Sequence, residues 1–163
     1  MAAHETETTC FTLADGTPSD AIAAAYRAAL LVLRPRLADL SIALISDGPW
    51  PAEAEHALQS LKPRTVRTRP MLRPWVTETG YHVDLDPRDD TDIEHALSLV
   101  PWTINAEGIA DDQSIAYSVN DSGTSAAFEL TPAEHAELTM ALADKGVDPR
   151  CLVALPRRRK TFS

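Results

Sequence analysis

Apolar residues recur along this chain with two different spacings. A spacing of three to four residues is typical of a helix that packs one face on a core. It predicts four helices, at residues 18–34, 51–61, 92–100 and 132–145. The last has the clearest start, because Thr131 is followed three residues later by Glu134, the pattern of a capping box.

Alternating or short continuous apolar runs predict strands between these helices. The predicted strands are residues 8–13, 41–46, 64–69, 75–86, 114–120, 124–130 and 151–155. Residues 121–123 (Asp-Ser-Gly) separate two of them and indicate a hairpin. Because the first helix joins the first two strands, we expect those strands to be parallel neighbours with a right-handed crossover.

The order of these elements predicts the α+β class. We expect a single domain at residues 9–155, built as a mixed β-sheet of about six to seven strands with four helices packed mainly on one face. Residues 1–8 are expected to be a flexible N-terminus, and residues 156–163 a basic flexible tail. A chain of 163 residues buries roughly 70% of its surface, which is enough for one core.

Charge is distributed unevenly along the chain, and this favours some partners over others. The net charge is −9, with −5 carried by residues 1–61, +5 by residues 62–73, −13 by residues 74–155 and +4 by the tail. An acidic body repels phosphate backbones and favours encounter with a basic surface, so the charge disfavours nucleic acid as a partner. The cluster that includes Arg67, Arg69 and Arg73 offers an alternative contact for a partner, although neighbouring carboxylates can neutralise it.

Further features of the sequence suggest where the protein resides. No apolar run approaches the length of a membrane span, and the first nine residues lack a secretory pattern, so we expect a cytoplasmic protein. Cys10 and Cys151 are too few for a disulfide framework. Arginine outnumbers lysine twelve to three and alanine is abundant, which indicates a GC-rich bacterial genome.

The strongest candidate for chemistry lies on the long strand at residues 75–86. Its odd positions are apolar or aromatic and predict an inner face, whereas Glu78, His82, Asp84 and Asp86 point outward. Same-face side chains on a strand are close enough for a histidine and carboxylates to share a divalent ion. The alternative is a solvated polar face whose carboxylates pair with Arg67 or Arg69 on the neighbouring strand.

All three tryptophans, Trp50, Trp75 and Trp102, follow a proline. Tryptophan at the edge of an element commonly seals the rim of a core, but exposed tryptophans can anchor a partner. We therefore consider both roles, with rim packing favoured.

Three helices begin with similar strings that contain His56, His95 and His135. Glutamate beside histidine suggests an acid/base pair, but helical neighbours point about 100° apart and do not meet. Glu94 and Glu134 each follow a threonine by three residues. Local helix capping therefore explains the similar strings better than an internal duplication of the chain does.

No residue forms a recognisable nucleophile motif or phosphate loop, so we assign no catalytic residue and no cofactor. The leading hypothesis is a small acidic, non-enzymatic protein that binds a partner with a basic surface, as an immunity or antitoxin protein does. The alternatives are a metal- or acid/base-dependent enzyme centred on His82, Asp84 and Asp86, and an accessory subunit of a larger assembly.

Overall fold

A computed structural model describes residues 7–44, 49–67, 81–103, 105–120 and 125–156. Its α-helices are α1 (Ser19–Leu33), α2 (Ala52–Leu61), α3 (Asp90–Leu99) and α4 (Pro132–Asp144). Its strands are β1 (Thr9–Leu13), β2 (Leu37–Leu44), β3 (Val66–Arg67), β4 (Tyr81–Leu85), β5 (Asn105–Ala110), β6 (Ile115–Asn120), β7 (Ala126–Leu130) and β8 (Leu152–Ala154). The four predicted helices are all present, and no helix in the described ranges is long and apolar enough to cross a bilayer.

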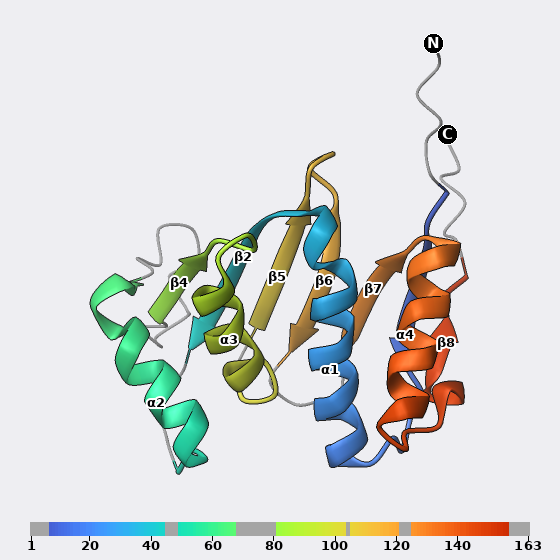
Figure 1. Cartoon of the computed structure of the whole chain (residues 1–163), viewed down its shortest axis with the longest axis horizontal. Helices are drawn as coiled ribbons and strands as arrows, with labels where there is room; N and C mark the ends of the chain where they lie inside the picture. Colours follow the sequence, from blue (N-terminus) through green and yellow to red (C-terminus); the bar gives the residue numbers. More distant parts are fainter. Residues whose placement is uncertain (1–6, 45–48, 68–80, 104, 121–124, 157–163) are drawn as a thin grey trace, which may run out of the picture.

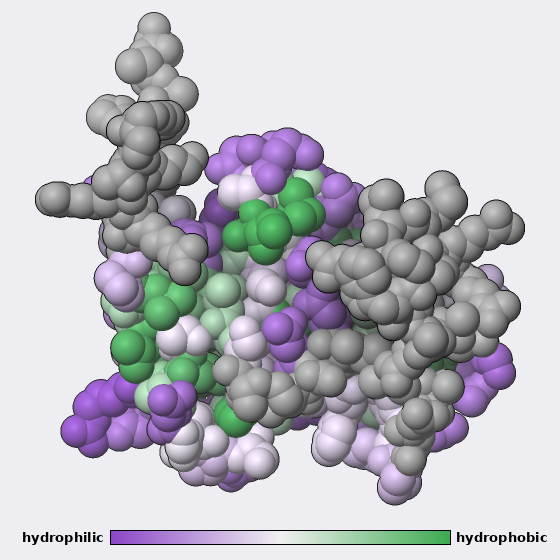
Figure 2. All heavy atoms as spheres, turned by 180° about the vertical axis from the view of Figure 1, so that it is seen from behind, coloured by the Kyte–Doolittle hydropathy of each residue, from purple (hydrophilic) through white to green (hydrophobic). Residues whose placement is uncertain are grey.

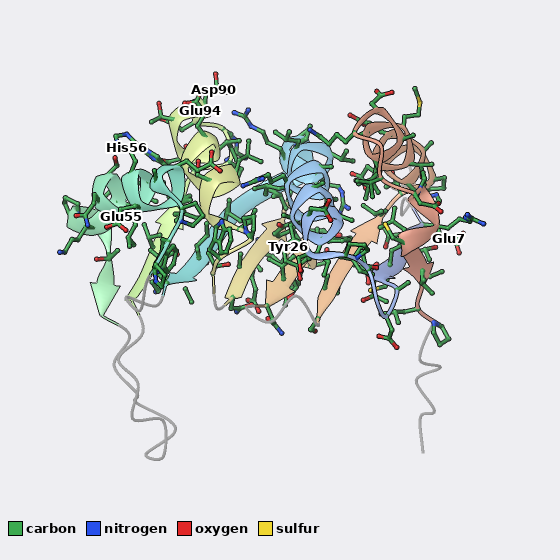
Figure 3. All side chains as sticks on the ribbon, turned by 90° about the horizontal axis from the view of Figure 1, so that it is seen from below. Glu7, Tyr26, Glu55, His56, Asp90 and Glu94 are labelled. Atoms are coloured by element: carbon green, nitrogen blue, oxygen red, sulfur yellow. The ribbon has the colours of Figure 1, made fainter. Side chains whose placement is uncertain are left out.

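The strands form one sheet in the order β3-β4-β2-β5-β6-β7-β1-β8. Figure 1 shows the helices side by side in front of this sheet, and the view from below in Figure 3 places all four on the same face. The α+β class and the helices on one face are therefore confirmed. The described sheet has eight strands, one more than the upper limit of the prediction.

The expectation of a mixed sheet with adjacent β1 and β2 is wrong. Every described pairing is antiparallel, and β5, β6 and β7 lie between β2 and β1. Four antiparallel steps give β1 and β2 the same direction, so the predicted orientation was correct. Their separation was missed because β1 is paired on both sides, by β7 and by β8.

The strand β5 was not predicted, because its inward positions are occupied by Ala106, Gly108 and Ala110 instead of large apolar residues. Gly108 has a packing reason: an added Cβ would lie 2.9 Å from the Leu37 side chain and 3.1 Å from the Tyr117 Cβ. Small residues here leave room for the larger side chains of the neighbouring strands. As a result, β5 has only a weak apolar pattern in the sequence, although it is paired with a strand on each side.

The core lies between the helices and the facing side of the sheet. Its largest fully buried side chains include Tyr26 and Leu30 of α1, Leu40 of β2, and Tyr117 and Phe128 of β6 and β7. Tyr26 and Phe128 make an edge-on ring contact with centroids 6.5 Å apart. The helices therefore bury one face of the sheet, and no described helix covers the other face.

Candidate functional site

No described helix covers the sheet face opposite the helices, which is the side seen in Figure 2. On β2, Leu40, Ile42 and Leu44 are buried beneath the helices. Their neighbours Ser41 and Ala43 therefore point to the opposite side, as the alternation of a strand requires. We call this side the open face.

Strand register aligns polar residues in rows across the open face. One row runs through Asp84, Ser41, Glu107 and Ser118, on four neighbouring strands. The next row runs through His82, Ala43, Asn105 and Asn120. Directly opposite residues have Cβ atoms about 5 Å apart, so each row is a continuous strip of side chains.

The open face carries carboxylates but no described arginine or lysine. Its acidic residues are Asp39 on β2, Asp84 on β4, Glu107 on β5 and Glu129 on β7. The remaining open-face strand positions with described side chains are Cys10, Thr12, Ser41, Ala43, His82, Asn105, Ile109, Ile115, Ser118, Asn120, Ala127 and Val153. A cationic partner would therefore meet no arginine or lysine among these positions.

The arginines with described side chains are instead neutralised by the chain's own carboxylates. Each lies between 2.5 and 3.7 Å from a carboxylate oxygen. The pairs are Arg27–Glu53, Arg34–Asp90, Arg36–Glu134, Arg64–Asp92, Arg88–Asp111 and Arg150–Asp148. No carboxylate of the open face belongs to one of these pairs.

Two of these pairs hold structural elements together. Arg64 donates two hydrogen bonds to the buried Asp92 carboxylate, which also accepts from the Asp86 backbone N–H. The Arg64 hydrogen bond holds the pKa of Asp92 below its ordinary value, despite the opposing effect of burial. Burial also tends to raise the pKa of Glu134, but hydrogen bonds from Arg36 and the Thr131 backbone lower it overall.

The open face also has an apolar part. Ile109 of β5 is directly opposite Ile115 of β6, and Asp39 of β2 is opposite Ile109 on the other side. A bulge at Ala116 lets Ile115 share the face of Ile109. The Ile115 residue remains 50% exposed, an unusual degree for a β-branched residue within a sheet.

The predicted pair of His82 and Asp84 does come together. His82 Nε2 lies 2.8 Å from Asp84 Oδ1, and both side chains occupy the open face near one edge of the sheet. Asp86 instead accepts a hydrogen bond from the Arg88 backbone in the following turn, and Glu78 lies outside the described residues. Within the ranges described, no three metal-ligating side chains gather.

The predicted aromatic and basic contacts are only partly described. Trp50 is partly buried against the core, whereas Trp102, after α3, is 46% exposed. Trp75, Arg69 and Arg73 lie outside the described residues. The backbone of Arg67 is opposite Tyr81 on β4, and its side chain is not described.

The three similar helix starts have different structures. His56 is exposed on α2, whereas His135 stacks on Phe11 with ring centroids 4.3 Å apart. Glu134 forms the predicted capping box with Thr131, but α3 begins at Asp90 and is capped by Asp89. The capping role predicted for Glu94 is therefore wrong.

An open cavity of about 640 Å³ lies between the β1–α1 turn and the end of α4. Its lining includes Gly16, Asp20, Lys145 and Cys151. Burial raises the pKa of the Cys151 thiol, which favours the unreactive protonated form. Burial and the nearby Glu129 likewise raise the pKa of Cys10.

Sequence reasoning missed Asp39, Glu107, Glu129, Ile109 and Ile115. They lie on four strands, and only the register shows that they share one face. Alternation within residues 114–120 predicted a strand with Ile115 on the same inner face as Tyr117 and Val119, but the bulge turns Ile115 to the open face instead. Comparisons with protein-family models, curated proteins and solved structures found no match.

Proposed function

We propose that this chain is a non-enzymatic protein-binding domain that engages a basic partner through the open face of its sheet. One observation carries the proposal: the open face holds Asp39, Asp84, Glu107 and Glu129, with no described arginine or lysine among them. Complementary charge across an interface speeds encounter and suppresses wrong partners. The net charge of −9 extends this preference beyond the face itself.

The arrangement of ion pairs supports the same function. Arginines at the helices and turns already have carboxylate partners, so they do not compete for the carboxylates of the open face. An incoming cation therefore does not displace an internal arginine, although Asp84 is already hydrogen-bonded to His82 and Glu129 accepts from the Thr8 hydroxyl. This keeps the cost of forming new charge pairs low.

The size of the face is also suitable. The six strands of five to eight residues, about 4.8 Å apart and about 17 Å long, give an area of about 500 Å², which fits a partner that contributes less than the ~800 Å² of a standard interface. One small protein or a basic segment of a larger one fits this area. We propose that this binding takes place in the cytoplasm of a bacterium.

A direct test uses a synthetic peptide that alternates lysine with serine. We expect the intact chain to bind it more weakly as NaCl rises from about 50 to about 500 mM, because salt screens exposed charges. The combined Asp84→Asn and Glu107→Gln variant should bind about tenfold more weakly at low salt, a loss of about 1.4 kcal/mol.

The matched control removes the same charge from the helix layer. Glu55 and Glu94 are exposed residues of α2 and α3, in the helix layer, and Figure 3 shows Glu94 on the outer side of α3. The Glu55→Gln and Glu94→Gln double variant should bind the peptide nearly as well as the wild type does. Equal losses in the two double variants, or binding indifferent to salt, would contradict the proposal.

A second candidate function remains for His82 and Asp84, which are 2.8 Å apart and partly accessible. A histidine hydrogen-bonded to a carboxylate can ligate a metal or transfer a proton. Titration with Zn²⁺ tests this function, since an ion held by the native state raises the melting temperature. An unchanged melting temperature, or the same rise in a His82→Gln variant, would dismiss the metal site.

A further inference from the structure

Ile109 and Ile115 form an apolar pair that the fold itself does not require. Ile115 is 50% exposed and faces away from the helices, so it adds little to the core. Threonine in its place would suit the strand, because it is also β-branched and only the solvent side of the sheet is affected. An exposed aliphatic pair within an otherwise polar face is a feature of interaction sites.

Carboxylates surround this pair on three strands. Asp39 is directly opposite Ile109, and Glu107 precedes Ile109 by two residues on the same side of β5. Glu129 lies on β7, one residue beyond Phe128, which is opposite Tyr117. Figure 2 shows apolar surface beneath the polar tip of the β5–β6 hairpin, with polar surface beside it.

We infer that Ile109 and Ile115 are the anchor point for the basic partner, which places an aliphatic or aromatic side chain on this pair and lysine or arginine on Asp39, Glu107 and Glu129. This inference rests on the proposed function and specifies the chemistry of the partner. Interfaces concentrate their binding energy in a desolvated apolar centre surrounded by polar groups. Ile115 is the more exposed of the two and makes the larger contribution.

A second copy of this chain does not fit as the occupant. Two open faces in contact would bring the carboxylates of one copy against those of the other, in a chain of net charge −9. Like charges placed opposite one another weaken binding. The charge pattern therefore selects a basic protein surface.

The test compares two synthetic peptides of equal length and charge, one alternating lysine with isoleucine and one alternating lysine with serine. We expect the isoleucine peptide to bind the wild type about tenfold more tightly than the serine peptide does. The Ile115→Ser variant should lose this preference and bind both peptides with similar affinity. The serine peptide should bind the variant and the wild type equally.

Met140 supplies the matched control, since it is 68% exposed on α4 and lies outside the open face. Met140→Ser should retain the full preference for the isoleucine peptide. Circular dichroism and thermal unfolding of both variants confirm that they are folded, and the backbone amide signals of β5 and β6 provide a second measure of where the peptide binds.

The possible results separate the two proposals. Salt-dependent binding of both peptides with no effect of Ile115→Ser would overturn the anchor and leave the basic partner intact. Absence of binding by either peptide would overturn both. Sedimentation would also overturn the anchor if the wild type were a dimer and the Ile115→Ser variant a monomer. The isoleucine pair would then join two copies of this chain.

Discussion

Two buried tyrosines show how single polar atoms contribute differently to stability. The Tyr117 hydroxyl donates to the Tyr26 backbone carbonyl at 2.9 Å. The Tyr26 hydroxyl is buried and has no hydrogen-bond partner among the described residues. Burial raises the pKa of both groups, so neither ionises near neutral pH.

Removing each hydroxyl should therefore have opposite results. Tyr117→Phe loses a buried hydrogen bond and should lower the free energy of unfolding by about 1 kcal/mol. Tyr26→Phe removes a buried hydroxyl without a described partner and should leave stability unchanged or raise it slightly. Urea unfolding of the two variants checks this, and equal losses would contradict the assigned contacts.

The Asp92 carboxylate joins α3 to Arg64 and to the Asp86 backbone, and its ionisation makes the stability of the fold depend on pH. Its pKa is lowered mainly by Arg64, so its stabilising effect is complete above the ordinary aspartate value of about 3.9 and is lost as pH falls through the lower folded value. Asp92→Asn should cost about 2 kcal/mol at pH 7 and reduce the loss of stability that the wild type shows as pH falls below about 4.

An exposed ion pair serves as the control for Asp92. Asp148 and Arg150 are paired at 2.9 Å on the surface, where water screens their attraction. Asp148→Asn should leave the urea midpoint at pH 7 unchanged. If the two asparagine variants were equally stable at pH 7, the structural role of Asp92 would be wrong.

At the scale of elements, the four helices differ in how well their first turns are capped. Prolines stand at the N-caps of α1 and α2, where no side chain accepts a backbone hydrogen bond. Asp89 caps α3, and Thr131 with Glu134 closes the capping box of α4. Local stability should therefore be greatest at the start of α4, where Arg36 also binds Glu134.

Two threonines on α4 provide a matched prediction about capping. Thr131→Ala removes the N-cap acceptor and should lower the free energy of unfolding by about 1 kcal/mol. Thr139 donates to the His135 carbonyl within the same helix, an interaction that competes with the helix, so Thr139→Ala should be neutral or slightly stabilising. Thermal unfolding that showed the reverse order would contradict the capping geometry.

The sequence was most informative where local contacts decide the structure. The Thr131–Glu134 box and the buried positions Tyr117, Val119 and Phe128 depend on residues a few positions apart, and both were predicted correctly. The predicted inner position of Ile115 was wrong, because the bulge on β6 interrupts the alternation. On β4, the predicted inner positions Val83 and Leu85 are indeed buried. By contrast, β5 was missed because Ala106, Gly108 and Ala110 bury little surface of their own.

For the whole molecule, the decisive features depend on distant pairings. The order of strands separates β1 from β2 and brings β5 to the middle of the sheet. Asp84 and Glu107 share a row only because β2 lies between their strands with a particular register. No local pattern encodes that register, so the excess of acid was visible in the sequence but its position on one face was not.

The central claim is that a basic partner covers the open face and not the helix layer. The most direct measurement is a two-dimensional NMR titration of the ¹⁵N-labelled chain with the lysine–isoleucine peptide. We predict that the amide shifts concentrate on β2, β5, β6 and β7 and include Glu107 and Ile115. Shifts confined to α2 and α3 would contradict the account, because the peptide would then bind the acidic side chains of the helix layer.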